Sequence, residues 1–149
     1  MDDVPAILMA TLHHLLAFTV FASLLFEHLL FRKGLTLADA KRLQATDTMY
    51  GLAVVGLIAV GLVRVYFFGK GSAAYFASAA FWTKMIAFGL VGVLSAYPTV
   101  RFLSWMKLTN AGQTPEVTEL DAKLIPWLLR AELVGIVVIV VSAVTMAQP

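Results

Sequence analysis

Four long apolar stretches, separated by shorter segments that hold most of the charged residues, set the pattern of this chain. They run from about Val4 to Phe31, Met49 to Phe68, Ala80 to Phe102 and Leu124 to Ala147. A helix needs roughly 20 residues to cross a bilayer. None of the stretches alternates between apolar and polar residues as a membrane strand does. The pattern therefore predicts an all-α integral membrane bundle of four transmembrane helices.

Composition supports this prediction and excludes other classes of protein. Of the 149 residues, 60% are hydrophobic and 13% are charged, whereas soluble domains carry about 25% charged residues. A soluble domain of this length cannot bury so much apolar surface. The composition excludes a soluble enzyme, a disordered chain and a nucleic-acid-binding protein, and it makes the lipid bilayer the expected partner. The length suits one domain, residues 1–149, and the absence of cysteine excludes thiolate metal sites.

Basic residues predict the orientation of the bundle. Seven of them follow the first and third stretches: Arg32, Lys33, Lys41, Arg42, Arg101, Lys107 and Lys123. The segment between the second and third stretches has only Lys70. The positive-inside rule places the two basic segments in the cytoplasm. We therefore expect a multi-pass membrane protein with both termini outside the cytoplasm, on the periplasmic side if the membrane is the bacterial inner membrane that the resemblance described below implies.

Ionisable groups inside the stretches cost about 2.5–3.5 kcal/mol each on insertion scales, so each needs a partner or a function. The predicted topology sorts them into two layers. The inner layer gathers Glu27, His28, Asp47, Tyr50, Arg101, Arg130 and Glu132. Ion pairs of Glu27 and Glu132 with Arg130 or Arg101 explain most of this layer, and Asp47 is a candidate cap of the second helix.

The outer layer brings together cationic groups without an acid at the same depth. Its members are His13, His14, Arg64 and Lys84. Like charges repel one another, so an anionic ligand such as a carboxylate or a lipid phosphate would compensate them. Loss of charge on the histidines and the lysine, or extension of the long side chains to the nearby surface, would relieve the repulsion equally.

The spacing of two histidines on the first stretch points to haem. His14 and His28 are fourteen residues apart, which places two imidazoles on one helix face at depths about 21 Å apart. Imidazole binds haem iron, so His13, His14 and His28 are the candidate metal ligands. Arg64, Lys70 and Lys84 are candidates for the haem propionates, and Tyr50 lies near His28 in depth.

A single four-helix bundle offers little interior for a macrocycle. We therefore expect a site between protomers of a homo-oligomer, with a second iron ligand from methionine, lysine, water or another protomer. A redox role would require a quinone or another redox partner.

Two further functions remain open. Met9 and His13, with Met85 and Met146, could bind Cu(I) at the periplasmic face, because thioether and imidazole groups suit this ion. Alternatively the protein is a structural, assembly or transport accessory subunit without enzymatic activity. Small residues on the second stretch, including Gly56, and Gly89 and Gly92 on the third predict close helix contacts.

The residues also resemble a known family. The segments that carry the resemblance are Tyr50-Gly51-Leu52, Gly61-Leu62-Val63-Arg64, Phe68-Gly69-Lys70-Gly71, Phe81-Trp82-Thr83-Lys84, Pro98-Thr99-Val100-Arg101-Phe102 and Arg130-Ala131-Glu132-Leu133. The chain resembles, over nearly its whole length, an uncharacterised family of four-helix bacterial inner-membrane proteins known as a domain of unknown function. This resemblance implies the fold but no activity.

A second resemblance is to the membrane-bound protoporphyrinogen oxidases of bacterial haem synthesis. Leu12-His13 and Lys84 match that family's histidine on the first span and lysine on a later one. The chain departs from it at Phe26-Glu27-His28 and at Tyr97-Pro98. The resemblance implies a tetrapyrrole near His13 and Lys84, and it makes a membrane oxidoreductase of tetrapyrrole metabolism a candidate activity.

Overall fold

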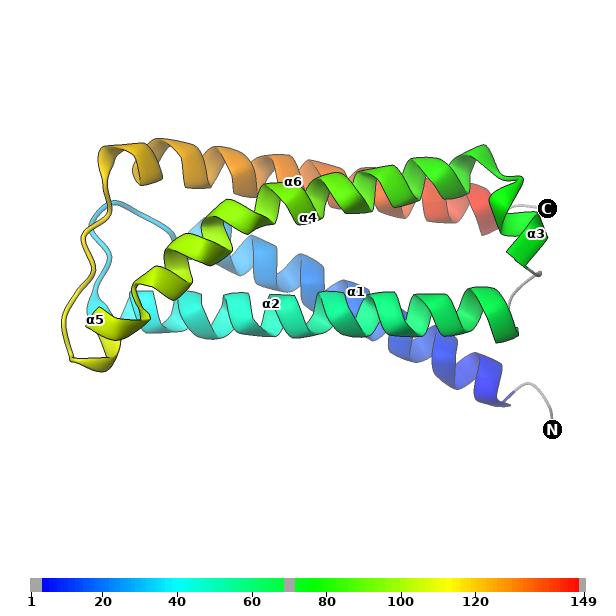
Figure 1. The fold of residues 1–149 in the computed structure, drawn as a ribbon, viewed down its shortest axis with the longest axis horizontal. Coiled ribbons are helices and arrows are strands. Elements are labelled where there is room, and N and C mark those ends of the chain that lie inside the picture. Colours follow the sequence, from blue (N-terminus) through cyan, green and yellow to red (C-terminus); the bar gives the residue numbers. More distant parts are fainter. Residues whose placement is uncertain (1–3, 69–71, 148–149) are drawn as a thin grey trace.

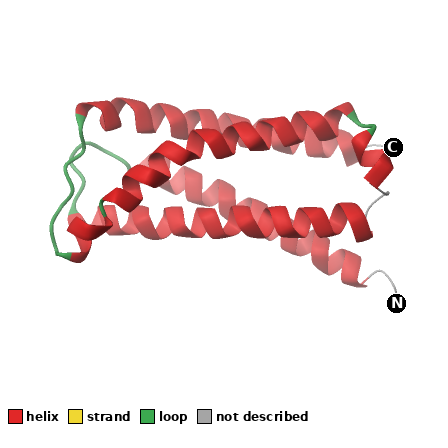
Figure 2. Cartoon of the chain, in the orientation of Figure 1, coloured by secondary structure: helices red, strands yellow, loops and turns green. Residues whose placement is uncertain are grey.

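The computed structural model describes residues 4–68 and 72–147, and all the regular structure in these ranges is helical (Figures 1 and 2). The elements are α1 (Val4–Leu30), α2 (Leu37–Val63), a turn of π-helix η1 (Arg64–Phe68), α3 (Ser72–Phe76), α4 (Ala79–Ser104), α5 (Met106–Asn110) and α6 (Glu119–Ala147). Four helical segments are long and apolar enough to cross a membrane. The predicted all-α fold with four spanning helices is confirmed.

Threonine and serine residues determine where three of the long helices begin. Thr36 accepts a hydrogen bond from the backbone of Asp39 at 3.1 Å, Ser78 accepts one from Phe81, and Thr118 accepts one from Asp121. Each is an N-cap, which satisfies a backbone donor that has no partner within the helix. Because of its cap, α2 begins at Leu37 and includes the polar residues that precede the second apolar stretch.

The four long helices form two pairs, α1 with α2 and α4 with α6 (Figure 1). Helix α1 begins and α6 ends at one end of the bundle, on the right of Figure 1, where α3 also lies. We call this the termini end. The connections 31–36 and 111–118 lie at the opposite end, which we call the loop end.

The two helix pairs pack tightly at the loop end only. The core gathers Leu24, Phe102, Ile125 and Leu129, each at most 1% exposed. The described parts of α1 and α2 have no buried side chain nearer the termini end than Val20 and Ala53. The pairs therefore enclose space between them in the termini half of the bundle.

The outside of the bundle is apolar along its whole length. Large hydrophobic side chains that are mostly exposed occur on every long helix, among them Leu29, Leu52, Val93 and Val134. A soluble domain rarely shows apolar patches of this extent. The outer faces therefore contact lipid.

Glycine permits the closest approach of α4 and α6. A Cβ at Gly135 would stand 2.4 Å from Cγ2 of Val91, whereas one at Gly89 or Gly92 would meet nothing within 4 Å. The predicted contact through the glycines of the third span was therefore wrong, because Gly89 and Gly92 point away from the neighbouring helices. The prediction for Gly56 is confirmed, since a Cβ there would stand 3.2 Å from Leu16.

We expect Gly135→Ala to lower the free energy of unfolding by about 1–3 kcal/mol, which is the usual cost of forcing an extra methyl group into a packed core. Gly89→Ala is the matched control and should not lower stability, because its Cβ meets nothing and alanine is favoured over glycine in a helix. Unfolding followed by circular dichroism in detergent compares the two variants. Equal stability of both would show that α4 and α6 do not meet at Gly135.

Candidate functional site

A pocket of about 670 Å³ lies between the two helix pairs in the termini half of the bundle. Residues of α1, α2, η1, α3, α4 and α6 line it. Its walls are mainly aliphatic and aromatic, and the aromatic residues are Phe18, Phe21, Tyr66, Phe76, Phe81 and Phe88. One chain thus holds a ligand-sized space, and the expectation that a single bundle has too little interior was wrong.

Two histidines of α1 are among the few polar residues that line the pocket. The rings of His13 and His14 are 6.2 Å apart and nearly perpendicular. His14 Nδ1 lies 2.6 Å from the carbonyl oxygen of Ala10. A carbonyl only accepts, so Nδ1 carries the proton and donates it, and in the neutral ring Nε2 then has the free lone pair. Metal-binding histidines are commonly oriented by such a second hydrogen bond.

The side chain of His13, also on α1, is more enclosed and packs against α2. A Cβ at Gly61 would stand 3.6 Å from Cε1 of His13 and 3.9 Å from its Nδ1. Gly61 therefore makes room for the imidazole ring. The Nδ1 atom is buried and has no hydrogen-bond partner among the described residues.

Lys84 of α4 is the cationic residue that lines the pocket. It is half-buried, and no acidic side chain in the described ranges lies within ion-pair distance of its ammonium group. Arg64 is not part of the lining but is close enough for its charge to act on His13 and Lys84. The predicted cationic layer therefore exists around this pocket. Lys70 lies outside the described residues.

The predicted copper ligands separate in the structure. His13 and Met85 both line the pocket, while Met9 and Met146 are not among its lining residues. Met146 instead borders a small cleft beside Ala74 and Tyr75 of α3. No cluster of histidine and acidic side chains in the described part of the chain is arranged to hold a metal ion.

His28 and Tyr50 are not part of the pocket. His28 lies in the last turn of α1, at the loop end. The buried Tyr50 lies beside Ser95 in the core of the loop half. His28 therefore cannot share a ligand in the pocket with His14.

Three buried carboxyl groups lie in the loop half. Glu27, Asp47 and Glu132 come from α1, α2 and α6, and each is at most 5% exposed. The three groups are close enough to interact electrostatically. Asp47 accepts a hydrogen bond from Thr99 at 2.7 Å. Asp47 is not the cap of the second helix as predicted, because Thr36 caps α2 and Asp47 lies in its interior.

The model of one protein family matches residues 5–148, and that family, DUF2214, is described as a predicted membrane protein. The chain belongs to this family. The first predicted resemblance, to a membrane family of unknown function, is thereby confirmed. No curated protein and no solved structure matches the chain. The resemblance to the protoporphyrinogen oxidases therefore has no support from known proteins.

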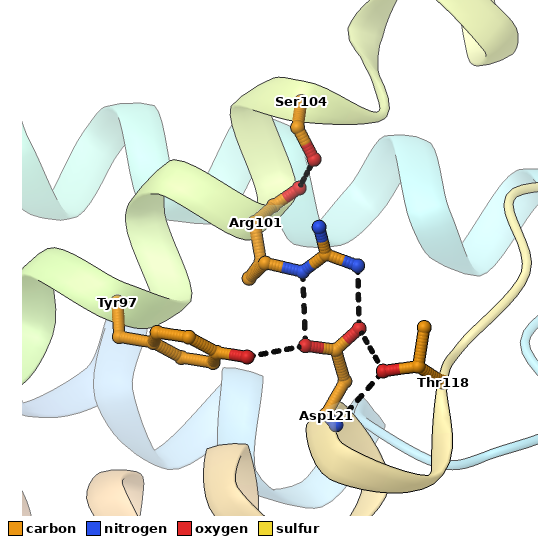
Figure 3. Close-up of polar contacts among 5 residues, drawn as sticks. All are labelled: Tyr97, Arg101, Ser104, Thr118 and Asp121. Atoms are coloured by element: carbon orange, nitrogen blue, oxygen red, sulfur yellow. Dashed lines mark hydrogen bonds and ion pairs between the residues drawn. The ribbon is translucent and has the colours of Figure 1, made fainter.

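In this DUF2214 protein, a network at the loop end joins α4 to α6. Figure 3 shows Tyr97, Arg101 and Thr118 converging on Asp121. Arg101 donates from Nε to Oδ1 at 2.9 Å and from Nη2 to Oδ2 at 2.6 Å. Tyr97 donates to Oδ1 at 2.8 Å, and Thr118 donates to Oδ2 at 2.8 Å. Asp121 is fully buried, and its carboxylate is saturated with hydrogen bonds.

This network corrects the predicted ion pairs. Arg101 forms its ion pair with Asp121 rather than with Glu27 or Glu132. Arg130 has an exposed side chain and forms no ion pair with a described residue. Sequence reasoning missed Asp121, although Thr118-x-x-Asp121 follows the pattern of a capping box at the start of a helix. Three other ion pairs, Arg32–Asp39, Arg42–Asp39 and Lys33–Glu119, also lie at the loop end.

Proposed function

We propose that this protein binds haem b or a related porphyrin in the pocket of the termini half, with His14 as the ligand of the iron. The observation that carries the proposal is an apolar pocket of about 670 Å³ that contains an oriented imidazole and an unpaired lysine within the described residues. Binding pockets for small molecules and cofactors usually measure about 300–1,000 Å³.

Each part of the pocket suits one part of a porphyrin. The aromatic walls, such as Phe18 and Phe88, suit the flat apolar ring. His14 Nε2 suits the iron, because Nδ1 is held by Ala10. Lys84 suits a propionate carboxylate, which would supply the missing counter-charge. Bound haem would supply one-electron redox chemistry, while the chain supplies position, charge and exclusion of water.

The proposal is tested by titrating haemin into the purified protein in detergent. We expect a sharpened and shifted Soret band that saturates at one haem per chain. No specific band at any ratio would overturn the proposal. That result would favour the accessory role, because a structural subunit needs no ligand.

A substitution at Gly61 tests the shape of the pocket without removing a polar group. We expect Gly61→Leu to abolish haem binding, because the added side chain would displace the His13 ring and fill the pocket. Gly61→Ala is the matched control, since its Cβ would make only an ordinary contact with His13. The apparent Kd for haemin should be at least tenfold higher in Gly61→Leu than in Gly61→Ala. Equal affinities would show that the ligand binds elsewhere.

A further inference from the structure

The three buried carboxyl groups of the loop half form no ion pair with a described residue, unlike the other two buried acids, Asp39 and Asp121. Glu27 is 1% exposed, Asp47 is 5% exposed and Glu132 is fully buried. An ionised carboxylate is expensive to bury unless it is paired and hydrogen-bonded. Acidic groups inside spanning helices are rare and usually face a partner or serve a function. This carboxyl cluster (Glu27, Asp47, Glu132) therefore requires an explanation that the pocket does not provide.

A second observation shows that the cluster lacks a partner. Both carboxyl oxygens of Glu132 and Oε1 of Glu27 are buried without a hydrogen-bond partner among the described residues. Asp121 is equally buried, yet each of its oxygens accepts two hydrogen bonds. The same helix, α6, thus carries one saturated carboxylate and one with orphaned oxygens. Orphaned buried atoms of this kind indicate that something else binds there.

The basic groups of the packed helices do not neutralise the cluster. Arg101 of α4 is bound to Asp121, and Arg130 of α6 is exposed. On α1, His28 follows Glu27 directly but forms no ion pair with a described acid, and its Nδ1 is also without a partner. From α2 the uncharged phenol of Tyr50 faces the cluster.

Lys84 lines the pocket at the termini end and Arg64 lies near it, and neither forms an ion pair with these carboxyl groups. Nor do the described acidic and histidine side chains form a group that could hold a metal ion. Protons are then the cations that fit the orphaned oxygens.

We propose that Glu27, Asp47 and Glu132 form a proton-binding site inside the membrane. Carboxylic acid groups at these positions hold protons, which leaves the cluster uncharged. Proton exchange between them breaks one O–H bond and forms another, so no electron changes hands. Gln44, Asp47 and Tyr50 are buried at intervals of three residues on one face of α2. Gln44 lies about one turn nearer the loop end than Asp47, and Tyr50 lies about one turn farther from it.

Infrared spectroscopy tests the proposal directly, because a protonated carboxylic acid has a carbonyl band separate from that of a carboxylate. In wild-type protein in lipid at neutral pH, we expect this band and a downshift of it in D2O. The band should weaken in Glu132→Gln and in Glu27→Gln and disappear in the triple variant with Asp47→Asn. Glu116→Gln is the control, since Glu116 is exposed, and it should leave the band unchanged.

Two results would overturn the proposal. One is a wild-type spectrum with carboxylate bands only, which would mean that the cluster is ionised. The other is a wild-type carbonyl band that does not shift in D2O, which would mean that it arises from lipid esters and not from a protonated acid. Both are measured on the wild-type protein, so they hold even where a variant fails to fold.

Discussion

Asp121→Ala is expected to lower the free energy of unfolding by about 3 kcal/mol, at the lower end of the range for breaking a buried ion pair. The substitution leaves the guanidinium of Arg101 without its partner in a half-buried position. It also removes the acceptor of the Tyr97 and Thr118 hydroxyl groups. Since Arg101 is 29% exposed, solvent offsets part of the loss.

Asp121→Asn is the matched variant for this prediction. It retains a carbonyl oxygen that accepts from Tyr97 or Thr118, but it loses the charge that pairs with Arg101. We expect a loss of stability between those of the wild type and Asp121→Ala, measured by thermal unfolding in detergent. If both variants are as stable as the wild type, the network in Figure 3 does not hold α4 to α6.

The second large effect is expected at His14. We predict that His14→Ala abolishes the Soret band of the haem-loaded protein, because the substitution removes the imidazole whose Nδ1 is fixed by Ala10. His13→Ala should retain the band, since His13 lies against Gly61 and is not oriented by a backbone acceptor. His28→Ala is the distant control and should bind haem as the wild type does. A band lost in His13→Ala and retained in His14→Ala would contradict the assignment.

Lys84→Met separates recognition of the ring from recognition of its carboxylates. The variant should bind haem about tenfold more weakly, because a hydrogen bond to a charged group contributes about 1.5 kcal/mol or more. The position of the Soret band should not change, since the iron ligand is unaffected. Unchanged affinity would show that Lys84 does not contact the ligand.

The fold of this protein could be predicted because the bilayer imposes a length on each apolar stretch. The stretches at residues 4–31 and 80–102 correspond closely to α1 and α4. Hydropathy could not find the start of α2, since Asp39 and Asp47 lie within a helix that Thr36 caps. Polar residues in the first turns of a helix look like a loop when only apolar residues are counted.

The candidate site was predictable in part. The depths of His13, His14 and Lys84 along their spans predicted that they lie at one level, and in the structure all three line one pocket. Depth alone could not give the pairing of Arg101 with Asp121, which depends on the register between α4 and α6. Depth also predicted that Glu27 and Glu132 would pair with basic residues at the same level. In the structure Arg101 pairs with Asp121, and Arg130 is exposed. The rotation of each helix about its axis decides such contacts.

The most direct test is the absorption spectrum of the protein purified from membranes of cells supplied with a haem precursor. The proposed function predicts a coloured protein whose Soret band corresponds to one haem per chain in the wild type and is absent in His14→Ala. A colourless wild-type protein that also fails to take up added haemin would contradict it.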